Sequence, residues 1–231
     1  MLDLRQFFVL TFDCYGTMID WETGIFSALR PILAAHKKEL ADPDLLQLYA
    51  ELELEAERGE YVKYWDVLSS VVRGFGERLG FRPSQAEERA LPESLAKWQP
   101  FPDTVEALRK LKQRYQLAVI SNIDDDLFAR SAPKLGVTFD YVTTAQQARC
   151  YKPGKKIFEL AQERMRVPTD KWLHVGQSIY HDVIPAHAMG LATVWVNRPS
   201  PRTGAGATKA ASAKPNLEVA SLAELAHAVN A

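Results

Sequence analysis

The sequence predicts an α/β protein: a Rossmann-like parallel sheet flanked by helices, with an all-helical cap inserted after the first strand. Two observations lead to this class. Short apolar runs, continuous rather than alternating in hydrophobicity, are followed by polar or glycine-containing turns and, in most cases, by a helical pattern. Such runs are typical of parallel strands that helices cover on both faces. One long segment after the first run interrupts this alternation and is helical in pattern throughout.

The apolar runs define the expected strands. Five strands are expected, at Phe7–Phe12, Leu117–Ser121, Tyr141–Thr144, Trp172–Val175 and Ala192–Val196. A short sixth strand is expected at Asn216–Val219. Each run is short enough to be a strand of ordinary length, and a polar or glycine-containing turn follows it.

Helical patterns fill the segments between and after these strands. The clearest expected helices of the core are Thr104–Lys112, Lys155–Arg164 and Leu222–Val229. Asp103 and Ser221 stand immediately before two of them and are expected to cap them. The stretch Arg198–Pro215, rich in small and polar residues, predicts a flexible surface loop.

The helical segment after the first strand spans residues 21–98 and predicts a cap of four or five helices. Apolar residues fall on two helical stripes. These are Leu45, Leu46, Leu48 and Leu52, and then Val62, Trp65, Leu68, Val71 and Val72. The expected domains are a Rossmann-like core at residues 1–20 and 99–231 and a cap at residues 21–98. The alternative is a set of extra helices packed permanently on the sheet.

Composition sets bounds on partners and location. The chain has 231 residues, 47% of them hydrophobic and 25% charged, which is enough for a sizeable core. A formal net charge of −1 gives no electrostatic reason to expect nucleic acid or an anionic membrane as partner. Two cysteines are too few for a disulfide framework. No apolar run reaches the ~18 residues of a membrane span, and a signal-peptide pattern is absent. We therefore expect a cytoplasmic protein.

Side chains with catalytic chemistry gather where the expected strands end. Asp13–Thr17 has the pattern D-x-Y-G-T and follows the first strand, and Ser121–Asn122 ends the second. Lys152–Pro153 precedes a helix, and Gly176–Asp182 has the pattern G-x-S-x-x-x-D after a later strand. Because ligands of open parallel sheets bind at the carboxyl ends of the strands, we expect these four clusters to meet in one crevice.

The residue types in these clusters suggest nucleophilic catalysis. A carboxylate such as Asp13 can form a covalent ester that divides one hard displacement into two easier steps. An ammonium such as Lys152 would hold it ionised, and Asp182 could activate water. Taken singly, each has a simpler explanation: a turn or helix cap for the two acids and a solvated surface for the lysine. The ordered set of four clusters carries more weight than its members.

This ordered set resembles the haloacid dehalogenase superfamily over essentially the whole chain. It is most similar to the 2-haloacid dehalogenase branch, which shares D-x-Y-G-T, a helical cap in this position and Tyr151-Lys152-Pro153. The resemblance implies hydrolytic dehalogenation of a small anionic 2-haloacid through an aspartyl ester. The implied catalytic residues are Asp13, Lys152 and Asp182. The implied substrate-binding residues are Tyr15, Thr17, Ser121, Asn122 and Ser178. Exposed cap helices could support a homodimer.

Two positions separate this branch from the phosphatases of the superfamily. Where those phosphatases have an acid that protonates the leaving group, this chain has Tyr15, whose phenol has a reference pKa near ~10. Where they commonly have an acid beside Mg²⁺, it has Gln177, and an amide brings less charge to a hard cation. A halide leaves without a proton, and Ser121, Asn122 and backbone N–H groups can hold a singly charged acid. We therefore expect no cofactor and no metal ligand.

Two other functions stay open. A Mg²⁺-dependent phosphatase of a small metabolite would use Asp13 and Asp182 as metal ligands, and metal dependence would distinguish it. A non-catalytic binding module would keep the fold, although such a module would be free to lose Asp13, Lys152 or Asp182.

The group that receives the halide is not evident from the sequence. Members of the branch have an arginine on an early cap helix, but residues 41–57 contain none. The nearest arginines are Arg30 and Arg58. The aromatic residues that could form a halide pocket are Trp21, Tyr61 and Trp65.

Overall fold

A six-stranded parallel sheet forms the centre of the molecule. The structure, a computed structural model, describes residues 2–198 and 206–229. The strands lie in the order β3-β2-β1-β4-β5-β6, and all neighbouring pairs are parallel. Their bounds are Val9–Phe12 for β1, Gln116–Ser121 for β2, Tyr141–Thr144 for β3, Trp172–Gly176 for β4, Ala192–Val196 for β5 and Leu217–Val219 for β6. The predicted α/β class and all six predicted strands are confirmed.

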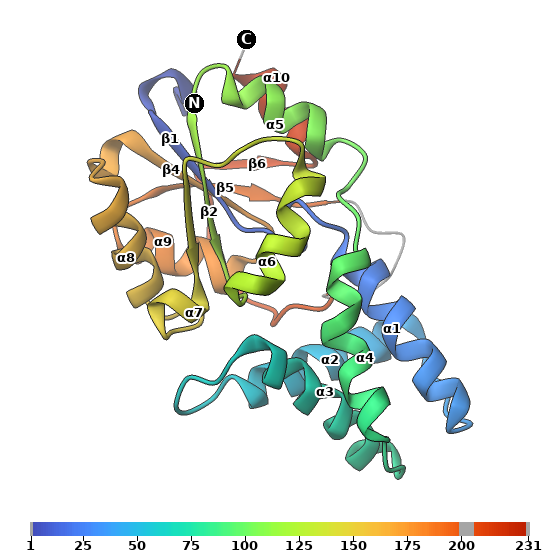
Figure 1. The fold of residues 1–231 in the computed structure, drawn as a ribbon. Coiled ribbons are helices and arrows are strands. Elements are labelled where there is room, and N and C mark those ends of the chain that lie inside the picture. The colour runs from blue at the N-terminus through green and yellow to red at the C-terminus, as the bar shows by residue number, and fades with distance from the viewer. Residues whose placement is uncertain (1, 199–205, 230–231) are drawn as a thin grey trace.

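Helices cover both faces of this sheet, with α5, α6 and α10 on one side and α8 and α9 on the other (Figure 1). Their bounds are Thr104–Lys112 for α5, Asp125–Ser131 for α6, Ala145–Ala148 for α7, Lys156–Met165 for α8, Ile184–Ala188 for α9 and Leu222–Ala228 for α10. Because both faces are covered, all four residues of the central strand β1 are buried. This explains why the strand is continuously apolar.

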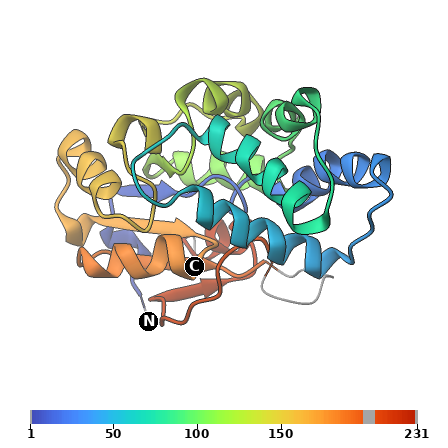
Figure 2. The same cartoon turned by 90° about the horizontal axis from the view of Figure 1, so that it is seen from below.

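The segment between β1 and β2 is entirely helical, as predicted. It contains α1 (Trp21–Ala35), α2 (Asp42–Ala56), α3 (Tyr64–Leu79), α4 (Gln85–Ser94) and the 3-10 turn η2 (Leu95–Lys97). We call these elements the cap helices. They pack on one another, α2 on α3, α3 on α4 and α4 on α1. They lie beyond the carboxyl ends of the strands, outside the layers of the core, as the two orthogonal views show (Figures 1 and 2). Among the described residues, no helix is both long and apolar enough to cross a bilayer.

Apolar burial explains the cap helices and corrects one detail. Leu45, Leu46 and Leu52 are buried, and Leu48 packs against them. On α3, Leu68, Val71 and Val72 are buried and Trp65 is partly buried. Val62, however, is 43% exposed and lies before α3, so its assignment to the second stripe was wrong. The helix begins only at Tyr64, where a carboxylate from the core caps it.

Three further details differ from expectation or fall outside the structure. β1 begins at Val9 rather than Phe7, and Phe8 is 61% exposed. Asp103 makes no side-chain cap to α5 and instead accepts hydrogen bonds from Leu222 N and Ala223 N at the start of α10. Ser221 caps α10 as predicted. Of the predicted loop Arg198–Pro215, residues 199–205 lie outside the described residues.

Candidate active site

The carboxyl ends of β1, β2 and β4 open into a cavity of ≈ 40 Å³ that the cap helices close. Its lining includes seven of the eight predicted site residues: Asp13, Tyr15, Ser121, Asn122, Lys152, Ser178 and Asp182. Only Thr17 does not line it, because it lies beneath Asp13. The three catalytic candidates are in direct contact, as expected for clusters that follow neighbouring parallel strands.

Asp13 is buried and held at both oxygens. Its Oδ1 accepts a hydrogen bond of 2.8 Å from Lys152 Nζ, and its Oδ2 accepts one of 2.8 Å from Thr17 Oγ1. Thr17 in turn accepts a hydrogen bond from Gln177 N. Thr17 therefore orients Asp13 and joins the loop after β1 to the loop after β4, and it does not line the cavity. Gly16 makes this turn with φ +91°, a conformation that residues with a side chain rarely adopt.

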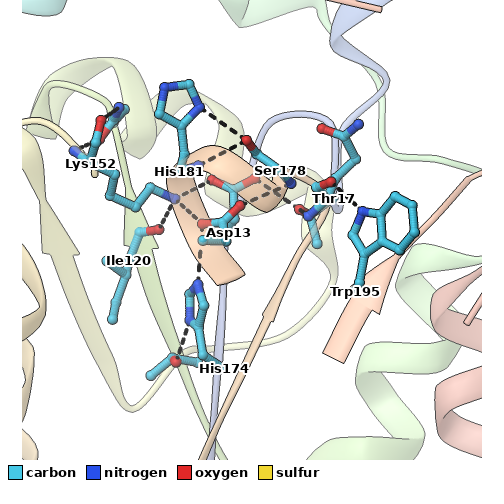
Figure 3. Close-up of polar contacts among 12 residues, drawn as sticks. Asp13, Thr17, Ile120, Lys152, His174, Ser178, His181 and Trp195 are labelled. Carbon is cyan, nitrogen blue, oxygen red and sulfur yellow. Dashed lines mark hydrogen bonds and ion pairs between the residues drawn. The ribbon is translucent and has the colours of Figure 1, made fainter. Parts of the chain in front are cut away.

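Lys152 is the centre of the cluster (Figure 3). Its ammonium donates to Asp13 Oδ1 at 2.8 Å, to Asp182 Oδ1 at 2.7 Å and to Ile120 O at 3.1 Å. An ammonium has three protons, so none is left for a substrate. Asn122 fixes the backbone of Lys152 from both sides, accepting from its N–H and donating to its carbonyl. The Asn122 amide, predicted to bind substrate, is therefore used to position the lysine.

Asp182 is fully enclosed and accepts hydrogen bonds at both oxygens. Its Oδ1 also lies 3.2 Å from His174 Nε2, and its Oδ2 accepts from Ser178 N. An ionised carboxylate only accepts hydrogen bonds, so His174 Nε2 carries the proton. Nδ1 of His174 then accepts from Thr11 Oγ1 at 2.8 Å. A Cβ at Gly176 would lie 2.4 Å from Asp182 Cγ, so only glycine fits beside the carboxylate.

The three charges shape one another's pKa values. Burial raises the pKa of Asp13 above its usual range, against the opposing effect of the Lys152 ammonium. Burial also disfavours the charged forms of the other two groups. For Asp182 the lysine and His174 outweigh burial and hold the pKa well below its usual range. For Lys152 the two carboxylates outweigh burial and raise the pKa. Asp13 is thus the more basic carboxylate, suited to attack, while Asp182 stays ionised and is a poor proton acceptor.

Two predicted binding residues face the cavity in different ways. Ser121 Oγ is buried and has no hydrogen-bond partner, the only such side-chain atom in the part of the chain that the structure describes. A buried hydroxyl without a partner is costly unless a ligand satisfies it. Tyr15 instead donates to or accepts from Ser131 Oγ at 2.9 Å and packs edge-on against Trp98. Burial raises the pKa of Tyr15 well above its usual value, so its phenol is a very weak acid.

Ser178 and His181 form the wall beside Asp182. Ser178 Oγ accepts from His181 N and lies 3.2 Å from His181 Nδ1. Ser178, rather than Asp182, is therefore the N-cap of the helical turn Ile179–Val183. Burial lowers the pKa of His181 to about 4, which keeps its imidazole neutral at neutral pH. His181 lines the cavity and is the unprotonated base on this side.

Sequence reasoning missed several residues of the site. His174 lies inside an apolar strand and carries no motif, so nothing in the sequence shows that it supports Asp182. Glu53 and Glu57 line the cavity from α2, although they look like surface acids of an amphipathic helix. The two candidate halide arginines lie elsewhere: Arg30 pairs with Asp42, and Arg58 is exposed.

Among the aromatic candidates, only Trp21 lines the cavity. Tyr61 and Trp65 instead bind Asp124, through the Tyr61 hydroxyl and the Trp65 backbone N–H. Asp124 also accepts from Tyr64 N, so this buried core carboxylate holds the start of α3 against the site.

The donor set fits a divalent cation poorly. The two carboxylates that follow β1 and β4, Asp13 and Asp182, are already bridged by the Lys152 ammonium. Gln177 supplies no charge, and its backbone N–H is directed to Thr17. Within the described residues, no three His, Cys, Asp or Glu side chains are grouped so as to hold a metal ion. Hard cations such as Mg²⁺ prefer several oxygen ligands with charge to spare.

Comparison with known proteins agrees with this fold. The model of the haloacid dehalogenase-like hydrolases matches residues 9–190, and the chain belongs to this family. It is 26% identical over 195 residues to the (S)-2-haloacid dehalogenase H-109 of Pseudomonas putida, covering 82% of this chain and 85% of that protein. It is 30% identical over 149 residues to the glyceraldehyde 3-phosphate phosphatase of Methanothermobacter thermautotrophicus, covering 63% of this chain and 65% of that protein. The structure of a defluorinating L-2-haloacid dehalogenase superposes with a TM-score of 0.81 at 20% identity, covering 100% of this chain and 99% of the other.

Proposed function

We propose that this hydrolase cleaves the carbon–halogen bond of a small 2-haloacid through a covalent ester on Asp13, without a metal ion. The observation that carries the proposal is the contact of Lys152 with both Asp13 and Asp182. A protein cation there balances the nucleophile and already occupies one oxygen of each carboxylate, which leaves a single net negative charge for a divalent metal. The haloacid dehalogenases among the relatives support the same chemistry.

The proposed reaction has two displacements. The carboxylate of Asp13 attacks the carbon that bears the halogen, the carbon–halogen bond breaks, and the halide leaves with the bonding electrons. Water from the cavity then attacks Cγ of the ester. The product hydroxyl keeps an oxygen of Asp13, and the water oxygen stays in the restored carboxylate. Each turnover consumes one water and releases one halide and one proton.

The other residues take supporting roles in this proposal. Thr17 and Lys152 orient Asp13, and Asp182 holds Lys152 rather than activating water, because its lowered pKa makes it a poor proton acceptor. The unpartnered hydroxyl of Ser121 donates to the substrate carboxylate. His181, neutral and at the cavity wall, is the base on hand for the attacking water. We further propose that residues 21–98 act as a cap domain on the core of residues 1–20 and 99–231.

A phosphatase is the second candidate, and the phosphatase relative favours it. Two features of the site oppose it. A phosphate ester needs a proton for its alkoxide leaving group, and Tyr15, with its raised pKa, is far too weak an acid. A phosphate dianion would also find only one lysine in the cavity lining, Lys152, which Asp13 and Asp182 already hold.

Turnover with heavy-oxygen water tests the proposal. The purified protein is given 2-chloropropionate, 2-bromopropionate or haloacetates in EDTA, and halide release is measured beside hydrolysis of p-nitrophenyl phosphate with Mg²⁺. We expect halide release in EDTA and, in single turnover, one heavy oxygen in the peptide that contains Asp13. Asp13→Asn should abolish release, whereas Asp170→Asn, a surface control, should not. Phosphate release that requires Mg²⁺, with no halide release, would favour the phosphatase.

A further inference from the structure

The cap side of the cavity carries an acid that the proposed chemistry has not used. Glu53 on α2 is 8% exposed and borders the cavity that contains Asp13. Its Oε1 accepts from Tyr49 at 2.9 Å and from Tyr64 at 2.6 Å. Both hydroxyls thus bind the same oxygen, and the two hydroxyls lie 3.3 Å apart. Oε2 has no partner in the described residues and is left to the cavity.

Among the described residues that line the cavity, no cation comes from the cap to balance this acid. Glu57, the C-cap residue of α2, also lines the cavity. The lining contains one lysine, Lys152, whose three protons already bind Asp13, Asp182 and Ile120 O. A second ionised carboxylate on the cap would therefore face Asp13 across a small cavity. In a site of low dielectric constant, such like charges strongly favour the neutral form of one partner.

The protonation of Glu53 follows from its surroundings. Burial raises the pKa of Glu53 to about 7, and the charge of Asp13 adds to the effect, while the Tyr64 and Tyr49 hydroxyls oppose it. Burial and Glu53 also raise the pKa of Glu57. His181 and Asp182 face the same cavity from the core, the first neutral and the second paired with Lys152. At neutral pH and below, much of Glu53 is thus a carboxylic acid with a proton to donate.

We propose that Glu53, as a carboxylic acid, donates a hydrogen bond from Oε2 to the departing halide, so that the cap provides a proton-donor site for the leaving group. The proposal rests on the proposed dehalogenation. As the bond between carbon and halogen breaks, the halide takes the electron pair and accepts this hydrogen bond, and the proton stays on Glu53. The tyrosines fix Oε1, which directs the proton of Oε2 to the cavity. No oxidant, reductant or metal is needed.

The pH dependence of bromide binding and of turnover tests this site. With a pKa of about 7, roughly nine-tenths of Glu53 is protonated at about pH 6 and a tenth at about pH 8. Calorimetry with bromide should therefore show about tenfold weaker binding by the wild-type protein at the higher pH. Halide release from 2-chloropropionate should fall over the same range. Glu53→Gln keeps an N–H donor without the titration, so its bromide affinity and turnover should be flat across this range.

Two further variants separate donation from a structural role. Tyr49→Phe removes one hydrogen bond that stabilises the ionised form of Glu53. The fall in halide release with rising pH should therefore occur at a higher pH in this variant. Glu57→Gln, the matched control at the C-cap of α2, should keep the fall in halide release with rising pH that Glu53→Gln lacks. If Glu53 had only a structural role, its variants would change the rate of halide release at every pH without changing the pH at which the rate falls.

The outcomes distinguish this inference from the function on which it rests. Two results would overturn the leaving-group site and leave the dehalogenase proposal standing. The first is a fall in halide release with rising pH that is the same in the wild type and in Glu53→Gln. The second is wild-type bromide binding that is equal at both pH values. Bromide binding that weakens with pH and becomes flat in Glu53→Gln, without halide release from any haloacid, would support the anion site and count against the dehalogenase proposal.

Discussion

At the scale of single residues, Lys152 determines what the cluster can do. It lies fully buried between Asp13 and Asp182, and its third proton binds the carbonyl of Ile120. A buried ion pair adds little net stability compared with apolar packing, but loss of one member leaves an uncompensated charge in the interior. With two carboxylates around one ammonium, loss of the lysine would leave both without their cation.

Replacement of Lys152 with methionine should therefore abolish turnover and lower the free energy of unfolding by about 3–5 kcal/mol. The double variant Lys152→Met with Asp182→Asn removes one of the stranded charges and should recover part of the stability without recovering turnover. Urea titration of the single and double variants, beside halide release, measures both effects. A double variant no more stable than Lys152→Met would show that the carboxylates are not the source of the penalty.

The residue scale also shows where sequence reasoning stops. Asp13, Lys152 and Asp182 could be found because each follows a recognisable strand and belongs to an ordered set. Glu53 could not, because an acid on an amphipathic helix is usually solvated, and only the packing of α2 over the site turns this one inward. His174 was hidden for a related reason: its partners, Thr11 and Asp182, come from other parts of the chain.

At the scale of elements, the loop after β2 connects the core to the cap helices. α3 begins at Tyr64 without a side-chain cap from its own N-cap residue, Lys63. Asp124 supplies the cap from the core, accepting from Tyr64 N at 3.1 Å and Trp65 N at 2.9 Å. A carboxylate at a helix N-terminus is favoured by the unpaired N–H groups and by the helix dipole. One short loop thus places Ser121, at the cavity, close to the residue that holds α3 in place.

Asp124→Ala should therefore loosen α3 and weaken substrate binding. We expect a loss of about 1–3 kcal/mol in stability, a raised KM and faster hydrogen exchange at the start of α3. Asp124→Asn keeps an acceptor oxygen and should retain much of the cap. Asp124 also immediately precedes α6. If hydrogen exchange became faster only in α6 and not in α3, Asp124 would have no role in holding the cap helices.

The bounds of elements were predictable where local chemistry decides them. Continuous apolar runs revealed the first five strands, and Ser221 capped α10 as its position before the helix suggested. Val62 and Phe8 are exposed because each lies just outside its element, and hydrophobic periodicity does not fix such ends. The α3 cap escaped prediction since its donor and acceptor lie about sixty residues apart.

At the scale of the whole molecule, the nucleophile loop is tied to the end of the chain. The side chain of Arg198 donates to the carbonyl of Thr17 at 2.8 and 3.1 Å and to Asp103 at 2.9 Å. Asp103 also accepts from Leu222 N, at the start of α10. The residue beneath Asp13 is thereby held by a network that joins the first helix after the cap to the last helix of the fold.

Asp103→Ala should consequently affect both stability and catalysis. We expect a loss of about 2–4 kcal/mol, because a partly buried arginine and the start of α10 lose their acceptor, and a fall in kcat of about tenfold as Thr17 shifts. Ser221→Ala is the matched control: it removes the other cap of α10, does not contact Arg198, and should cost about 1 kcal/mol with kcat unchanged. Equal kcat in both variants would refute the connection to the site.

The same network predicts an acid limit to its stabilisation. Burial works to raise the pKa of Asp103, but Arg198 and the N–H groups outweigh it and hold the pKa below its ordinary value of 3.8. A carboxyl with a lowered pKa in the folded state contributes its full stability above the unfolded value and loses it as pH falls toward the folded value. The difference in unfolding free energy between wild type and Asp103→Asn, from urea titrations, should therefore be constant from about pH 7 to 5 and narrow below about pH 4. A difference that persists unchanged at about pH 3 would mean that packing, and not the charge of Asp103, ties the last helix to the nucleophile loop.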